Sequence, residues 1–131
     1  MNIETLIILY VADQEESAQF YKVVLGTEPC LHVPGMTEFQ LTDGCRLGLM
    51  PEASIKKLMG NKFPDPSKAS GIPRAELYLS VENAQLYHDR AIANGAIELS
   101  GLQKRPWGGS VAYSIDPDGH VLAFCEVARN D

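Results

Sequence analysis

The sequence predicts an α+β protein made of two tandem βαβββ modules, and two internal repeats indicate this fold. Residues 43–50 read DGCRLGLM and residues 118–125 read DGHVLAFC, so a D-G-x-x-L pattern recurs at an offset of 75 residues. A strand-like segment followed by a helical run that ends at a glycine also occurs twice, at an offset of about 70. Two repeats in the same order favour a duplication. We therefore expect one domain over residues 1–131, with module one at about 1–50, an insert at about 51–73 and module two at about 74–131.

The first module opens with the apolar run from Leu6 to Val11, which predicts a strand. Asp13 has a glutamate three residues later, a capping-box pattern that predicts the start of a helix. Gly26 marks the end of this helix. Further strands are predicted over 37–41 and 46–50, joined by an Asp-Gly turn.

The second module repeats this order with a strand over 77–81 and a helix capped by Asn83 that ends before Gly95. Strands over 110–115 and 121–127 follow, joined by an Asp-Pro-Asp-Gly turn. We expect the inward side chains of the helix to include Leu86, Ala91 and Ile92.

The insert between the modules is rich in proline and holds four of the eight prolines. Residues 52–59 could form a short helix, and residues 61–71 resemble a loop. A segment of this length is either a lid over a binding site or a solvated connector.

Composition excludes several classes of function. The chain has 11 Lys+Arg against 17 Asp+Glu, a net charge of −6, and no basic patch of the kind that binds nucleic acid or anionic membranes. Its three cysteines lack the spacing of a disulfide framework or a zinc knuckle, which suits a reducing cytosol. The first apolar run has six residues, too few for a signal peptide or a membrane span. We expect a cytoplasmic protein.

Side-chain alternation divides each predicted sheet into two faces. One face is entirely apolar, as a face covered by helices requires: Ile7, Leu9, Val11, Leu47, Leu49, Leu77, Leu79, Val81, Leu122 and Phe124. The other, called here the mixed face, carries charged, aromatic, sulfur-containing and small residues: Leu6, Ile8, Tyr10, Arg46, Gly48, Met50, Glu76, Tyr78, Ser80, Val121, Ala123 and Cys125. Such a composition predicts either a small-molecule pocket or a dimer interface.

Several motifs of the chain resemble the vicinal oxygen chelate superfamily, which includes glyoxalase I, extradiol dioxygenases, and fosfomycin and bleomycin resistance proteins. The motifs are Tyr10-Val11-Ala12-Asp13, Ser17-Ala18-Gln19-Phe20-Tyr21, Leu25-Gly26, Pro106-Trp107-Gly108 and Asp116-Pro117-Asp118-Gly119-His120. The resemblance covers essentially the whole chain. It implies the glyoxalase/bleomycin-resistance fold, in which paired βαβββ modules form a curved mixed sheet around a cavity, and a homodimer.

The resemblance also implies where the metal-using members hold their ligands. Those four positions fall on Leu6, Gly48, Glu76 and Ala123, all on the mixed face. Only Glu76 can bind a metal, whereas a catalytic transition-metal site needs about three protein ligands. His32, in a turn-like stretch, His88, in mid-helix, and His120, in a turn, do not share the spacing of a ligand set. No metal and no cofactor are expected, and the metal-free, bleomycin-resistance-like members are the better match.

Individual residues of the predicted site keep alternative roles. Three roles are open for Glu76: it forms an ion pair with Arg46, it contacts the ligand, or it acts as a catalytic base. Trp107, which the resemblance puts at the cavity mouth, is an aromatic wall or a packing anchor. Arg105 and Lys104 either meet an anionic ligand or, as is usual for basic residues beside a loop, are solvated; Tyr113 is left out of the site. The predicted ligand-binding set is Leu6, Ile8, Tyr10, Arg46, Gly48, Met50, Glu76, Tyr78, Trp107, Ala123 and Cys125.

The leading interpretation is a protein that binds a small organic molecule without a metal. An alternative is a lyase, isomerase or dioxygenase-like enzyme that uses Glu76 as a base or in a noncognate metal site, with ligands such as Glu38 or His32. A third interpretation treats the mixed face as a protein interaction surface.

Overall fold

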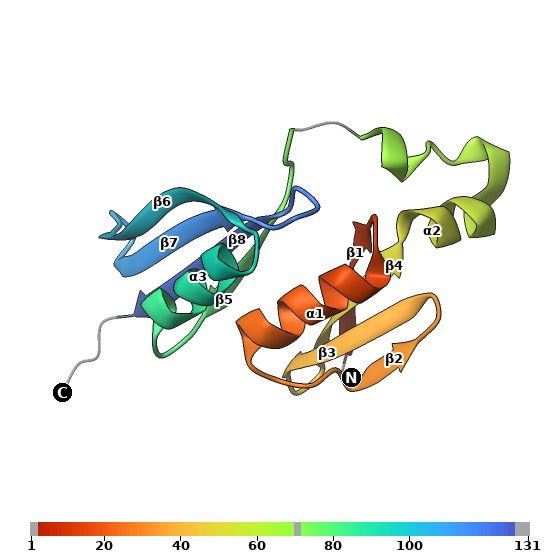
Figure 1. Cartoon of the computed structure of the whole chain (residues 1–131). Coiled ribbons are helices and arrows are strands. Elements are labelled where there is room, and N and C mark those ends of the chain that lie inside the picture. Colours follow the sequence, from red (N-terminus) through yellow and green to blue (C-terminus); the bar gives the residue numbers. More distant parts are fainter. Residues whose placement is uncertain (1–2, 70–71, 128–131) are drawn as a thin grey trace. The chain divides into compact units, whose positions relative to one another are not determined.

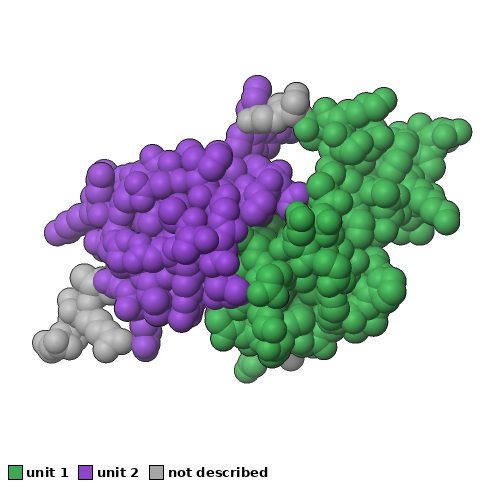
Figure 2. All heavy atoms as spheres, viewed as in Figure 1, with its two compact units in different colours: residues 1–22, 26–70 green, residues 23–25, 71–131 purple. Residues whose placement is uncertain are grey.

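A computed structural model describes residues 3–69 and 72–127. The chain forms two compact units, one of residues 1–22 and 26–70 and the other of residues 23–25 and 71–131 (Figure 2). No helix in the described ranges is long and apolar enough to cross a membrane.

The first unit contains a four-stranded mixed sheet (Figure 1). Its strands are β1 (Thr5–Val11), β2 (Leu31–Val33), β3 (Met36–Thr42) and β4 (Cys45–Pro51), in the spatial order β1-β4-β3-β2. β1 runs parallel to β4, and the other neighbours are antiparallel. Leu47 and Leu49 of β4 are fully buried on the apolar face, whereas Ile7 of the edge strand β1 is 43% exposed.

Helix α1 (Gln14–Leu25) is the crossover that parallel pairing of β1 and β4 requires. The Asp13 carboxylate accepts a hydrogen bond from the Glu16 backbone N–H at 3.0 Å, and Gly26 ends the helix in the left-handed conformation. The sequence-based prediction of this helix and both its ends is confirmed. Phe20 and Val24 of α1 are buried.

The insert is more ordered than its loop-like sequence indicates. Helix α2 (Glu52–Met59) is present as predicted, and the short 3₁₀ turns η1 (Gly60–Lys62) and η2 (Pro66–Lys68) follow it. The Phe63 ring lies edge-on to the Tyr10 ring, with centroids 6.3 Å apart. The insert therefore borders the mixed face of the first sheet at Tyr10, and its role as a lid stays a prediction.

The second unit repeats the topology of the first (Figure 1). Its strands are β5 (Glu76–Ser80), β6 (Ile97–Lys104), β7 (Gly109–Ile115) and β8 (Val121–Val127), in the order β5-β8-β7-β6. β5 is parallel to β8, and the other neighbours are antiparallel. The α+β fold of two βαβββ modules is confirmed, with a separate four-stranded sheet in each module.

Helix α3 (Ala84–Ala93) packs on β6, β7 and β8. Asn83 caps it as predicted, its side-chain oxygen accepting from the Leu86 N–H at 3.1 Å. The predicted inward set is wrong in part, because Leu86 and Ile92 are 42% and 37% exposed. Ala91 is buried as expected, with Ala84 and His88. The helix therefore turns two alanines and a histidine toward the sheet, a choice that apolar periodicity does not show.

The registers of the two parallel pairs support the duplication. Ile8 lies beside Gly48 in the first sheet, and Tyr78 lies beside Ala123 in the second. The two pairs are related by the offsets of 70 and 75 residues seen in the sequence. Gly48 and Ala123 are therefore equivalent positions of the two modules.

We predict that Asp13→Ala lowers the free energy of unfolding by about 1 kcal/mol, because the Glu16 N–H loses its side-chain acceptor. Urea denaturation measures the loss. Asp13→Asn keeps a side-chain oxygen at the cap and is the control, with a much smaller expected effect. An equal loss in both variants would contradict the capping role.

Candidate functional site

The mixed face of the first sheet has the composition that the sequence predicts. Leu6, Ile8 and Tyr10 alternate with the core-facing residues of β1, and the register sets them beside Arg46, Gly48 and Met50 of β4. β3 adds residues that the sequence analysis does not place there, because Glu38 lies beside Gly48 and Gln40 beside Arg46. Counting outward from the Asp43-Gly44 turn puts them on the wrong face, because the register shifts between Gln40 and Thr42.

Arg46 forms an ion pair within its own sheet. Its Nη1 lies 2.9 Å from Oε1 of Glu38, a buried side chain. A buried carboxylate is unfavourable unless a cation or hydrogen bonds compensate its charge, and Arg46 provides that compensation. The predicted partner of Arg46, Glu76, is thus replaced by Glu38.

Gly48 is surrounded by apolar side chains. A Cβ atom at this position would lie 3.1 Å from Leu6 Cδ1, 3.2 Å from Ile8 Cγ1 and 3.3 Å from Met36 Sδ. An acidic side chain here would have to displace all three neighbours. The residues of the first module therefore do not fit a metal ion at the positions that the resemblance implies, Leu6 and Gly48.

His32 and Glu38 cannot form the alternative metal site. His32 lies in β2 rather than in a turn and pairs with Thr37, so it is on the opposite face of the sheet from Glu38. Its Nδ1 is 2.7 Å from Thr37 Oγ1, and its Nε2 is 3.0 Å from a carboxylate oxygen of Glu15. Across the described ranges, no cluster of three or more His, Cys, Asp or Glu side chains is arranged to hold a metal.

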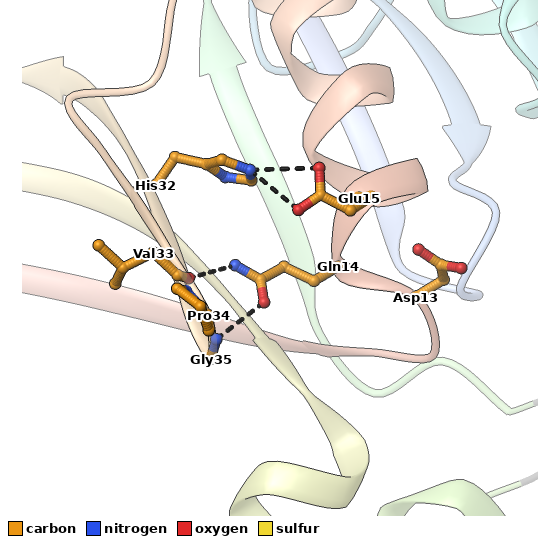
Figure 3. Close-up of a pocket in the computed structure, with 7 residues that line it drawn as sticks. All are labelled: Asp13, Gln14, Glu15, His32, Val33, Pro34 and Gly35. Carbon is orange, nitrogen blue, oxygen red and sulfur yellow. Dashed lines mark hydrogen bonds and ion pairs between the residues drawn. The ribbon is translucent and has the colours of Figure 1, made fainter.

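The start of α1 and residues 32–35 line an open hollow of about 360 Å³ (Figure 3). The Gln14 carboxamide crosses it, donating to Val33 O at 2.8 Å and accepting from Gly35 N–H at 2.9 Å. These bonds and the His32–Glu15 contact fix β2 to the helix (Figure 3). The polar groups of the hollow are occupied with one another, which is a structural role.

The mixed face of the second sheet is built on small buried residues. Ala123 and Cys125 of β8 and Val111 of β7 are at most 3% exposed and form a cluster, against which Tyr113 packs. Tyr113 pairs with Ala123, so it lies on this face although the sequence analysis left it out. Ile115 and Val121 pair across the 116–119 turn, and counting back from this pair places Tyr113 beside Ala123. This register was not used in the sequence analysis.

Tyr78 and Trp107 make an aromatic pair beside this cluster. The Trp107 indole Nε1–H donates to the Tyr78 hydroxyl oxygen at 3.2 Å, although the two residues are 29 positions apart. Tyr78 also hydrogen-bonds the Cys125 sulfur, and this bond raises the pKa of Tyr78 because the phenol is the donor. The Trp107 bond acts in the opposite direction, and desolvation of Tyr78 adds to the increase.

Gly109 leaves room for the Cys125 sulfur. A Cβ atom on Gly109 would lie 2.7 Å from Cys125 Sγ, closer than real side chains approach. Gly109 is the first residue of β7, directly after the turn that carries Trp107. The glycine therefore lets the Trp107 turn and the Cys125 thiol lie next to each other.

Glu76, the residue predicted as a base, is the first residue of β5 and lies beside Val121. It is exposed, and its carboxylate has no hydrogen bond or ion pair with any other residue that the structure describes. Its catalytic role stays a prediction.

Comparison with known proteins identifies the family. The glyoxalase-like domain profile matches residues 4–128, nearly the whole chain. The chain belongs to the glyoxalase-like domain family. This match supports the resemblance to the vicinal oxygen chelate superfamily that the sequence motifs indicated.

Solved structures of this family share the fold. A glyoxalase-related enzyme from Fulvimarina pelagi is 24% identical, with a TM-score of 0.79 over 96% of this chain and 88% of that one. A glyoxalase/bleomycin resistance protein/dioxygenase family enzyme from Burkholderia phytofirmans is 20% identical, with a TM-score of 0.81 over 97% and 100%. An uncharacterised protein of Mycobacterium tuberculosis H37Rv is 23% identical over 92% of this chain and 72% of its own length.

The residues of the second module do not fit a transition metal either. Its two implied ligand positions hold Glu76 and Ala123, and Ala123 has no donor atom and is fully buried. One carboxylate does not replace the three protein ligands of a catalytic site. No metal-dependent step is derived for this protein.

We predict that Cys125→Ala lowers the pKa of Tyr78 toward its ordinary value of 10.0, because the protonated phenol loses its acceptor. Trp107→Phe should raise the pKa of Tyr78 further, since the indole N–H stabilises the phenolate. Ultraviolet titration of tyrosinate measures both shifts, and subtraction of the Tyr78→Phe curve isolates Tyr78 from the other tyrosines. A higher pKa in Cys125→Ala would contradict the assigned hydrogen bond.

Proposed function

We propose that this glyoxalase-like protein binds a small organic molecule on the mixed face of its second sheet and does so without a metal ion. The observation that carries the proposal is the cluster of Tyr78, Trp107 and Cys125 on a floor of small buried residues. Most small-molecule sites combine apolar and aromatic walls with a few placed polar groups, and this cluster has that composition.

The aromatic pair supports binding because it is both exposed and held in place. Trp107 is 61% exposed and Tyr78 is 42% exposed, so each ring offers apolar surface to a ligand. The hydrogen bond between them fixes the orientation of both rings before a ligand arrives. A ligand that stacks on fixed rings loses less side-chain entropy than one that must order them.

The two mixed faces differ in the exposed groups that they offer. Trp107 of the second is 61% exposed and is held by Tyr78. In the first, Gly48 is crowded by Leu6, Ile8 and Met36, and Arg46 is paired with Glu38. The mixed face of the second sheet is therefore the better candidate for a ligand. The residues of the predicted set on the first sheet contribute packing and the Arg46–Glu38 pair.

Binding without a metal is supported by the residues at the implied ligand positions. Leu6, Gly48 and Ala123 supply no donor atoms, and Glu76 alone cannot form the site. The protein acts as a cytosolic homodimer in this proposal. Sequestration of the ligand requires affinity only, so no bond needs to be broken.

We predict saturable binding of planar organic compounds that alters the fluorescence of Trp107, the single tryptophan of the chain. Compounds are selected by thermal shift and then titrated in EDTA and again after addition of Zn²⁺. The dissociation constant should be the same in EDTA as after addition of Zn²⁺. Binding that appears only with the metal would contradict the proposal, as would the absence of binding by every compound in a broad aromatic, peptide and glycan set.

We further predict that Tyr78→Phe weakens this binding by up to about tenfold, because Trp107 loses the hydrogen bond that orients it. Tyr87→Phe is the matched control, since the Tyr87 ring packs against Phe124 on the apolar face. Its affinity should match the wild type. Equal losses in both variants would show a general effect on the fold and would contradict the site.

A further inference from the structure

We propose that the ligand of the second sheet carries one carboxylate-like negative charge and that Arg105 binds it. The inference rests on the proposed function and specifies its ligand class. The structure associates two arginines with the mixed faces, Arg46 and Arg105, and their surroundings differ.

The main chain of Arg105 begins the tight turn between β6 and β7. Its N–H donates to Gly109 O at 2.8 Å, and its carbonyl accepts from Gly108 N–H at 3.2 Å. The same turn carries Trp107, two residues further on. A ligand that stacks on Trp107 is therefore within reach of a long side chain from the start of this turn.

The Arg105 side chain is fixed rather than solvated, which corrects the sequence-based expectation. Its Nε and Nη2 donate to Val111 O at 3.2 and 2.8 Å. Nη2 also donates to Ser100 Oγ at 2.7 Å and to Gly101 O at 3.2 Å, where the pairing of β6 with β7 is irregular. The guanidinium is thus preorganised by three neighbouring residues.

The guanidinium also lies over the mixed face. Its central carbon is 5.1 Å from the centroid of the Tyr113 ring, and Tyr113 packs on the small-residue cluster of Ala123 and its neighbours. A cation above an aromatic ring is stabilised by the ring's quadrupole, which holds the charge near the proposed ligand.

The charge of Arg105 has no anionic partner among the residues that the structure describes. All its acceptors are a hydroxyl and two backbone carbonyls, and neither hydrogen of Nη1 has an acceptor there. Arg46 differs, because Glu38 neutralises it at 2.9 Å. A half-buried cation with neutral partners retains its attraction for an anion. Nη1 supplies the two free donors for it.

The chemical class follows from these donors and from the charge of the chain. Guanidinium groups bind carboxylates and phosphates best, and the free donors of one nitrogen suit a single anionic oxygen. The net charge of −6 disfavours a polyanion. The aromatic pair selects a planar body, so the ligand is a planar aromatic monocarboxylic acid.

The test compares acids with their neutral analogues. Benzoate, indole-3-carboxylate and naphthalene-2-carboxylate are each titrated beside the corresponding carboxamide by isothermal calorimetry. We expect the acids to bind about tenfold more tightly than the amides at low salt, with a smaller ratio at high salt. Equal affinities of acid and amide would overturn the charge inference while the proposed function stands. Absence of binding by acids and amides alike, while other planar compounds of the broad set bind, would overturn the ligand class and leave the proposed function standing.

Variants assign the effect to Arg105. Arg105→Gln should reduce the ratio of acid affinity to amide affinity to about one, because the charge that distinguishes an acid from an amide is removed. Lys104→Gln is the matched control, because it removes one charge from the adjacent, exposed residue. It should change the acid affinity by less than about twofold. An equal effect of both variants, or a ratio of acid affinity to amide affinity that Arg105→Gln leaves unchanged, would overturn the proposal.

Arg105→Lys is a second variant, which keeps the proposal testable if Arg105→Gln prevents the β6–β7 hairpin from forming. It keeps the charge but loses the fork that contacts Val111, Ser100 and Gly101. Acid binding between that of the wild type and Arg105→Gln supports the assignment. Acid binding at or below the Arg105→Gln level, with amide binding retained, would overturn it.

Discussion

Parallel pairing of the first and last strand of each module is the constraint on which the rest of the structure depends. β1 pairs with β4 and β5 with β8, so each module needs a crossover between the paired strands, which a helix and two further strands form here. The pairing also sets the register. Because side chains alternate along a strand, the register decides at once which residues face the helix and which form the mixed face.

The two modules share this framework but use their mixed faces differently. In the first, Leu6, Ile8 and Met36 close over Gly48, and Glu38 neutralises Arg46. That face is satisfied by its own residues. In the second, Ala123 forms a floor, and two aromatic side chains remain exposed. Duplication has preserved the backbone, while different side chains on the two mixed faces separate their chemistry.

Contacts in the second module connect the hairpin turn to the sheet. Cys125 fits beside Gly109 because the glycine has no Cβ, and its sulfur accepts from Tyr78. Tyr78 in turn accepts from Trp107, which comes from the turn that precedes Gly109. The orientation of the most exposed aromatic ring of the site therefore depends on a buried thiol on a central strand. Each of these contacts is local, and together they connect the exposed Trp107 ring to the buried Cys125 side chain.

The sequence by itself determined the fold, because strand alternation, the helix caps at Asp13 and Asn83 and the Asp-Gly turns are local signals. It also determined that Leu6, Gly48 and Ala123 cannot bind a metal, since this depends on residue type alone. The tertiary structure decided the partners: Glu38 for Arg46, Tyr78 for Trp107 and neutral acceptors for Arg105. Such pairs join residues on different strands and turns, and side-chain contacts across a sheet depend on the register and on turn geometry, which no local pattern specifies.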